Sequence, residues 1–264
     1  MKKELKFAFY AVKKNIQSSA ELRTSFLMNI IGMAINDISF IILWMFFVKS
    51  VGVIGGWTTL DIIALQGFTS LCFGLVLSFG DGIRRISLLV SSGSFDRFML
   101  SPKNLLLRIA TSSFGASALG DIFFGIICLV IYAFLIHASI LQILLILFSI
   151  IISTVVFLSV GIVIYSMTFY FTDAHSVTYG LFQLFFTPAI FHGGAFQGVM
   201  RFVFTFFIPS LLIGTFPVEI VRDVSIWKLL MISVLAIFWF IFSIIIFNRA
   251  VRRYESSNFM TFGS

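Results

Sequence analysis

Two aspartates stand inside apolar stretches where a charge is costly. Asp37 interrupts a stretch from about 26 to 48, and Asp121 interrupts one from 105 to 136. A carboxylate at the centre of a membrane helix costs about 2.5–3.5 kcal/mol, so each must face a partner, a cavity or a helix end. One interpretation is a proton or cation relay, as in an ion-coupled secondary transporter. The other, which we favour, is a polar contact between helices, with Asn36 beside Asp37.

Motifs for enzymatic chemistry are absent from the sequence. There is no GxxxxGK[ST] phosphate loop, no HExxH and no CxxC, and the three histidines are scattered at positions 137, 175 and 192. Cys72 and Cys128 both lie in apolar stretches, where a free cysteine behaves as a small hydrophobic residue. We therefore predict a non-catalytic protein with no metal site and no cofactor of its own.

The composition indicates a membrane protein. Of 264 residues, 59% are hydrophobic and 11% are charged, against roughly 25% charged residues in soluble domains. The net charge of +7 does not indicate nucleic-acid binding, because the basic residues lie between apolar stretches and not on one face of a domain. We predict an all-α, polytopic membrane protein whose residues 1–264 form a single domain.

Six transmembrane helices are predicted from the apolar stretches, each needing about 20 residues. The 51 residues between Asp121 and Asp173 carry no acidic or basic residue except His137. One helix of that length would reach roughly 75 Å, so the chain must turn back, and 137–139 is the best position. The predicted spans are about 26–48, 62–80, 112–136, 140–168, 177–191 and 229–247.

The distribution of lysine and arginine predicts the orientation. With the N-terminus inside, 14 of the 18 basic residues fall in cytosolic segments and 4 in outer ones. Positive charge accumulates on the cytosolic side of membrane proteins. Both termini are therefore predicted to be cytosolic, in the cytoplasmic membrane of a bacterium.

Two further segments do not resemble simple spans. Residues 1–23 alternate lysines with apolar side chains and predict an amphipathic helix that lies along the membrane lipid. Residues 202–218 are uncharged, but Pro209, Gly214 and Pro217 interrupt them. We expect two short helical pieces that dip into the outer face and return, within an outer segment of about 193–225.

A polar stretch between the second and third spans is unusual for this chain. Residues 93–104 read GSFDRFMLSPKN and follow a short amphipathic helix that begins at Arg84 and Arg85. Gly93 breaks that helix, and Pro102 ends the following turn. We interpret 84–104 as a compact cytosolic element that could transmit a push from a partner; a plain connecting loop is the alternative.

The pattern at 93–104 resembles the cytosolic loop of ABC type-2 permeases, which reads roughly G-x-x-D-x-x-L-x-x-P-x-N. The rest of the chain is similar in layout: a basic amphipathic N-terminal helix, six spans, and a proline-broken segment with Pro188, Pro209 and Pro217 before the last span. The resemblance covers essentially the whole chain.

The resemblance implies the membrane subunit of an ATP-driven exporter that works by alternating access. Such a subunit pairs with itself or with a second, similar permease, and with a dimer of a separate ATPase that binds the ATP. The loop would dock in a groove of that ATPase, and the substrate would be a hydrophobic or amphipathic small molecule, peptide or lipid. The residues assigned to the loop contact are Arg84, Arg85, Gly93, Phe95, Asp96, Arg97, Pro102 and Asn104.

Overall fold

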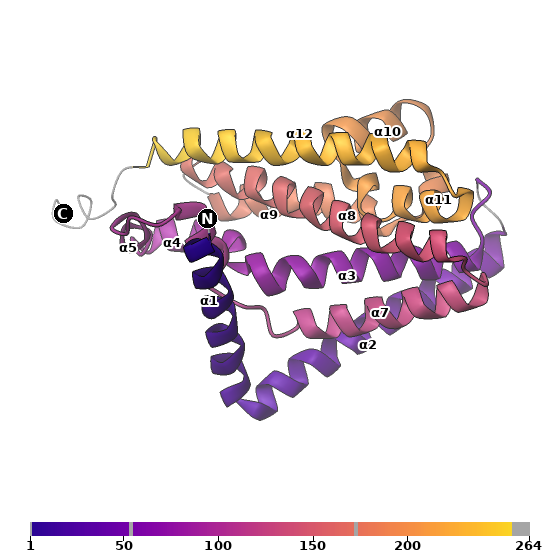
Figure 1. Ribbon diagram of the computed structural model, residues 1–264, viewed down its shortest axis with the longest axis horizontal. Coiled ribbons are helices and arrows are strands. Elements are labelled where there is room, and N and C mark those ends of the chain that lie inside the picture. The colour runs from indigo at the N-terminus through magenta and orange to yellow at the C-terminus, as the bar shows by residue number, and fades with distance from the viewer. Residues whose placement is uncertain (1, 53–54, 172–173, 255–264) are drawn as a thin grey trace.

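A computed structural model describes residues 2–52, 55–171 and 174–254, and every regular element in these ranges is a helix. Four long helices lie side by side, with a fifth inclined across them (Figure 1). The four are α3 (Thr59–Arg84), α7 (Ala118–Leu135), α8 (Ile140–Ser166) and α12 (Ile226–Val251), and the inclined helix is α2 (Arg23–Val51).

Within the described residues, five helices are long and apolar enough to cross a membrane, so the prediction of an all-α, polytopic membrane protein is confirmed. The predicted fifth span corresponds to α9 (Ala174–Ile190), which has 17 residues and is about 25 Å long at 1.5 Å per residue. The count of six spans stays a prediction. Pro188, predicted to belong to the proline-broken segment before the last span, instead lies buried in the last turn of α9.

The turn between α7 and α8 lies at the predicted position. His137 adopts a left-handed conformation with φ of 50°. Ser139 then caps α8: its hydroxyl accepts from the Gln142 N–H at 3.3 Å, and the Gln142 side chain accepts from the Ser139 N–H at 3.0 Å. This capping box satisfies N–H groups that the first helical turn leaves free.

Helix α3 occupies the centre of the molecule and packs closely on α7. A Cβ atom added at Gly125 would lie 2.6 Å from the backbone nitrogen of Leu71, and one added at Gly74 would lie 2.7 Å from the carbonyl oxygen of Ala118. Small residues at these crossings let the two backbones approach, as is typical of helices packed in membranes.

The segment between α9 and α12 is broken into short pieces. These are a 3-10 turn (Gly193–Ala195), α10 (Gly198–Phe202), a π-helical turn (Val203–Phe207), a second 3-10 turn (Ser210–Leu212) and α11 (Thr215–Asp223). Pro209 lies between the π turn and the second 3-10 turn. Pro217 stands in the first turn of α11, where a missing N–H costs no helical hydrogen bond.

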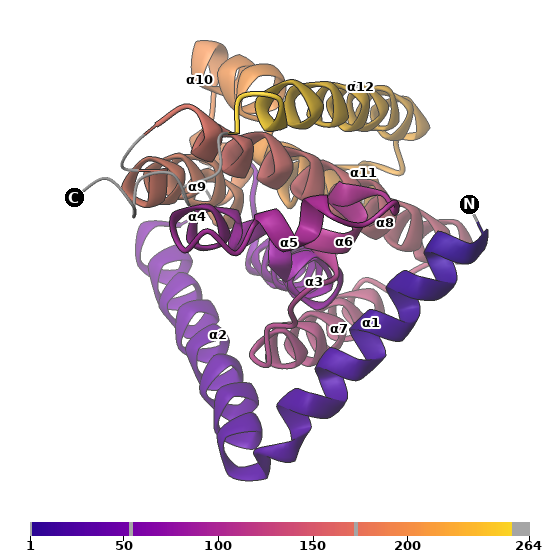
Figure 2. The ribbon, with the colours of Figure 1, turned by 90° about the vertical axis from the view of Figure 1, so that its left-hand side faces the viewer.

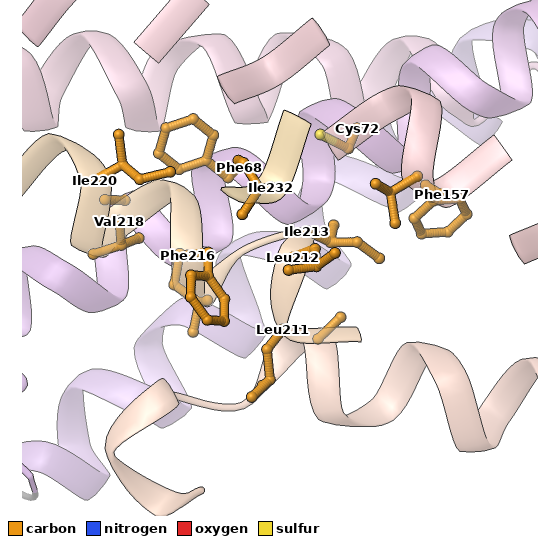
Figure 3. Close-up of a cluster of buried hydrophobic side chains, with 14 of the residues drawn as sticks. Phe68, Cys72, Phe157, Leu211, Leu212, Ile213, Phe216, Val218, Ile220 and Ile232 are labelled. Atoms are coloured by element: carbon orange, nitrogen blue, oxygen red, sulfur yellow. The ribbon is translucent and has the colours of Figure 1, made fainter. Parts of the chain in front are cut away.

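The second 3-10 turn inserts into the main hydrophobic core. Leu211, Leu212 and Ile213 are fully buried, in one cluster with Phe68 of α3 and Phe157 of α8 (Figure 3). The Ser153 hydroxyl of α8 also donates to the Leu212 carbonyl at 2.8 Å. Because these side chains pack between long helices, the broken segment is an integral part of the bundle.

Short helices gather at the opposite end of the bundle from α11 (Figure 1). They are α4 (Ile86–Ser91), α5 (Asp96–Met99) and α6 (Leu105–Ala110), and α1 (Lys2–Glu21) runs across this end (Figure 2). Asn15 of α1 donates to the Thr111 carbonyl at 2.9 Å, and the Lys103 ammonium lies 3.8 Å from the centre of the Phe7 ring. These contacts fasten α1 to the chain that leads into α7.

Candidate functional site

A cavity of about 680 Å³ lies between α2 and α9, with α3 forming its floor. Its wall is partly polar, with amide and hydroxyl side chains from all three helices. These polar side chains are Asn36, Gln66, Thr69, Ser70, Thr178, Gln183 and Thr187. Gln66, Thr69 and Thr178 donate to backbone carbonyls, and the oxygen atoms of these side chains can still accept hydrogen bonds.

Aromatic rings form much of the rest of the wall. Phe182 and Phe186 of α9 are stacked with ring centres 5.6 Å apart, and Phe73 of α3 lies 5.1 Å from Phe186. Phe40, Tyr165 and Tyr179 also line the cavity. The cavity can therefore hold an apolar body against rings while polar groups contact hydrogen-bonding substituents.

Asp37 and Asp121 both line this cavity, one from α2 and the other from α7. Their exposed fractions are 8% and 1%. The Oδ2 atom of each carboxylate has no hydrogen-bond partner among the described residues. Sequence reasoning found both residues but could not predict that they share one cavity.

Arg84 and Arg85 line the same cavity near its α4 end and bind a buried acid. Their guanidinium groups lie 3.2 and 3.0 Å from the two carboxylate oxygens of Asp81, and the Ser113 hydroxyl donates to Asp81 at 2.9 Å. Sequence analysis missed Asp81. The signal was its spacing, because residues three and four apart share one face of a helix.

The loop between α3 and α7 folds as a compact element around Phe95. Gly93 has φ of +68° and ends α4, which allows Phe95 to turn inward, where it is fully buried. Its ring centre lies 5.2 Å from that of Phe169 and 4.8 Å from that of Tyr254. The loop is therefore packed on the ends of α8 and α12 and not only on the helices that it connects.

Asp96 and Arg97, adjacent in sequence, have different surroundings. Burial and the adjacent Asp96 carboxylate raise the pKa of Tyr254 to about 12, so the phenol stays protonated beside the carboxylate. Arg97 is exposed and donates to the Ser94 hydroxyl at 3.3 Å. Leu100, at the tip, is 85% exposed, so the tip offers an unusual apolar side chain to a partner.

The two remaining predicted loop residues lie beyond the tip. Pro102 is exposed. Asn104 caps α6: its side-chain oxygen accepts from the Leu107 N–H at 3.0 Å, while its own N–H donates to the Glu4 carboxylate of α1 at 3.3 Å. Asn104 therefore joins the loop to α1.

A network of ion pairs closes the α11 end of the bundle. Buried Glu219 accepts two hydrogen bonds of 2.8 Å from Arg201 and one of 3.1 Å from Lys228. Lys228 also lies 2.6 Å from Asp223, and Arg222 lies 3.5 Å from Asp61 at the start of α3. Sequence analysis did not predict this network, since its partners are brought together only by the fold.

A comparison with protein-family models matches residues 33–258 to a family described as ABC-2 family transporter protein. The chain belongs to this family. No curated protein and no solved structure gives a significant match. The ABC-2 protein is thus a multi-pass membrane transport component, and membership of the family implies association with an ABC ATPase.

Proposed function

We propose that this ABC-2 protein is the permease subunit of an ATP-driven exporter, coupled to a separate ATPase dimer through residues 84–104. The observation that carries the proposal is the burial of Phe95 against Phe169 and Tyr254. A rigid element with an exposed tip and a buried base transmits displacement better than a solvated loop. ATP would be bound by the partner, which accounts for the missing phosphate-loop motif.

The proposed orientation places the α4–α5 end in the cytosol. Arg97, Arg108, Arg249 and Arg253 all lie at this end of the bundle, as does α1 with Lys13 and Lys14. Both termini are then cytosolic, in agreement with the positive-inside rule, and α1 lies along the inner lipid surface. Phe9 and Tyr10 of α1 are exposed apolar side chains that suit contact with lipid.

The proposed transport path includes the cavity between α2 and α9, completed by a second similar permease. Helix α2 exposes a long row of apolar side chains, and only 6% of the residues in its most apolar stretch are buried. A second permease, identical or merely similar, would cover part of this row. The aromatic and polar lining supports an amphipathic substrate, and alternating access would open the path to one side at a time.

Co-purification tests the proposed docking element. The permease is co-expressed with a candidate ABC ATPase from its own genome, and the double variant Arg97→Glu, Leu100→Asp changes only the exposed tip. We expect loss of ATPase from the purified complex, because the variant places two acidic groups where an apolar and a basic group stood. Arg23→Glu, an exposed charge reversal at the α1–α2 junction, is the matched control.

Two outcomes would contradict the proposal. One is undiminished association of the Arg97→Glu, Leu100→Asp variant with the ATPase. The other is full transport by the permease alone in vesicles, driven by a proton or sodium gradient, which would support an ion-coupled secondary transporter that uses Asp37 or Asp121.

A further inference from the structure

We propose that Asp37 and Asp121 together bind a positively charged group of the cargo, so that the cavity selects organic cations. This inference rests on the proposed function in one respect, namely that the cavity is part of the transport path. The two carboxylates come from different helices and line one cavity, and each keeps an oxygen atom without a hydrogen-bond partner among the described residues.

The arrangement of charged side chains in the cavity favours a cationic ligand. Arg84 and Arg85 are the lysine or arginine side chains among the described residues that line it, and both are paired with Asp81 at 3.2 and 3.0 Å. Asp37 and Asp121 have no such ion pair in the described part of the chain. A buried carboxylate without a counter-charge is strongly unfavourable. A bound cation would supply the counter-charge that these two carboxylates lack in the protein.

The aromatic side chains of the cavity wall favour a cation with an apolar body. Phe73, Phe182 and Phe186 form a contiguous group of rings on the cavity wall, and Tyr179 lines it as well. The face of an aromatic ring attracts a cation and also accepts apolar surface. Acids and rings together fit a cation that carries its charge on an apolar, preferably aromatic, body.

The residues that line the cavity favour an organic cation over a metal ion. No group of three or more histidine, cysteine, aspartate or glutamate side chains able to hold a metal occurs within residues 2–52, 55–171 and 174–254. A cavity of about 680 Å³ also exceeds what a dehydrated metal ion needs, whereas a small molecule of drug-like size fits cavities of roughly 300–1,000 Å³.

Binding of two hydrophobic ions of equal shape and opposite charge tests the proposal. The full-length permease in detergent is dialysed against tetraphenylphosphonium or tetraphenylborate, and bound ion is measured at equilibrium. We expect saturable binding of the phosphonium, at least tenfold weaker in Asp37→Asn and in Asp121→Asn, and lost in the double variant. The borate should show no saturable site in this cavity.

Two control variants keep the result interpretable. Glu21→Gln neutralises an exposed acid at the end of α1, outside the cavity, and should leave phosphonium affinity within twofold. Asp121→Glu retains the charge and should recover most of the affinity lost in Asp121→Asn, which a merely misfolded variant would not explain.

Equal binding of the phosphonium to wild type and to the double variant would overturn the proposal, as would saturable binding of both ions at the same affinity. The second result would indicate that the two acids are protonated and that the cavity recognises apolar surface alone. None of these measurements needs the ATPase, so undiminished association of the Arg97→Glu, Leu100→Asp variant with the ATPase would contradict the proposed function and leave the cation site standing.

Discussion

The ring of Phe95, between α4 and α5, lies 4.8 Å from the ring of Tyr254, just after α12 ends at Val251. Residues 159 positions apart in the sequence, counted from 95 to 254, thus meet at the base of the proposed docking element. Because Phe169, after α8, joins the same contact, we expect movement of the loop to displace the ends of two long helices.

Replacement of Phe95 by Ala should uncouple the permease from its ATPase. The change empties a fully buried site and costs about 3–5 kcal/mol of packing at the base of the loop. We expect ATPase still to co-purify, because the exposed tip is intact, while ATP-driven transport falls at least tenfold. Transport into inverted vesicles measures this, with Val199→Ala, an exposed residue of α10 outside the loop, as control. Unchanged transport in Phe95→Ala would contradict the mechanical role.

The ion-pair network at the α11 end should contribute to stability. Glu219→Gln removes the negative charge that binds both Arg201 and Lys228 and leaves two partly buried cations near one another. Since both cations are about one-third exposed, we expect a loss of about 2–3 kcal/mol in the free energy of unfolding, less than for a fully buried pair. Thermal unfolding in detergent measures it.

Asp223→Asn serves as the comparison in the same network. Its carboxylate is more exposed than that of Glu219 and binds Lys228 and Arg222 from the edge. The melting temperature should therefore fall less than in Glu219→Gln. A larger loss in Asp223→Asn would show that the network is held from its exposed edge.

Stability should decrease as the pH falls below about 6.5, because of His192. This residue is buried against Trp44 and Trp57, with ring centres 5.5 and 6.4 Å away, and burial lowers its pKa below the ordinary value of 6.5. The unfolded chain then binds a proton before the folded chain does. The stabilisation is therefore present above pH 6.5 and is lost as the pH falls toward the folded-state pKa.

The measurement is the difference in melting temperature between pH 7.5 and pH 5.5. His192→Gln cannot take up that proton, so its melting temperature should depend less on pH than that of the wild-type protein. An identical pH dependence in both proteins would assign the effect to other groups.

Two glycines in long helices should respond oppositely to alanine. Gly125→Ala places a Cβ atom 2.6 Å from the backbone of α3, which cannot move aside without separating α3 from α7, so the variant should lose stability. Gly161→Ala in α8 meets nothing within 4 Å and should gain up to about 1 kcal/mol through helix propensity. Thermal unfolding measures the stability of the two variants. Equal changes in melting temperature would contradict the close packing of α3 on α7.

Local features of the fold were predictable from the sequence. Apolar stretches predicted the long helices, and the 51 uncharged residues after Asp121 required the turn at 137–139, because helix length is limited by membrane thickness. The family resemblance was carried by a short polar pattern that hydropathy made conspicuous. Each of these features depends only on residues that are neighbours in the sequence, so it can be recognised without knowledge of the tertiary structure.

Tertiary structure alone decided which charges and rings meet. Asp37 and Asp121 share a cavity because α2 and α7 both pack on α3, Arg84 and Arg85 turn to the buried Asp81, and Glu219 draws Arg201 and Lys228 together. Hydropathy determines which segments leave water, but within the membrane every helix is apolar, so partners are chosen by close packing and by the cost of an unpaired charge. Close packing and the cost of an unpaired charge both depend on positions in space, and these positions cannot be read from the separation of residues along the sequence.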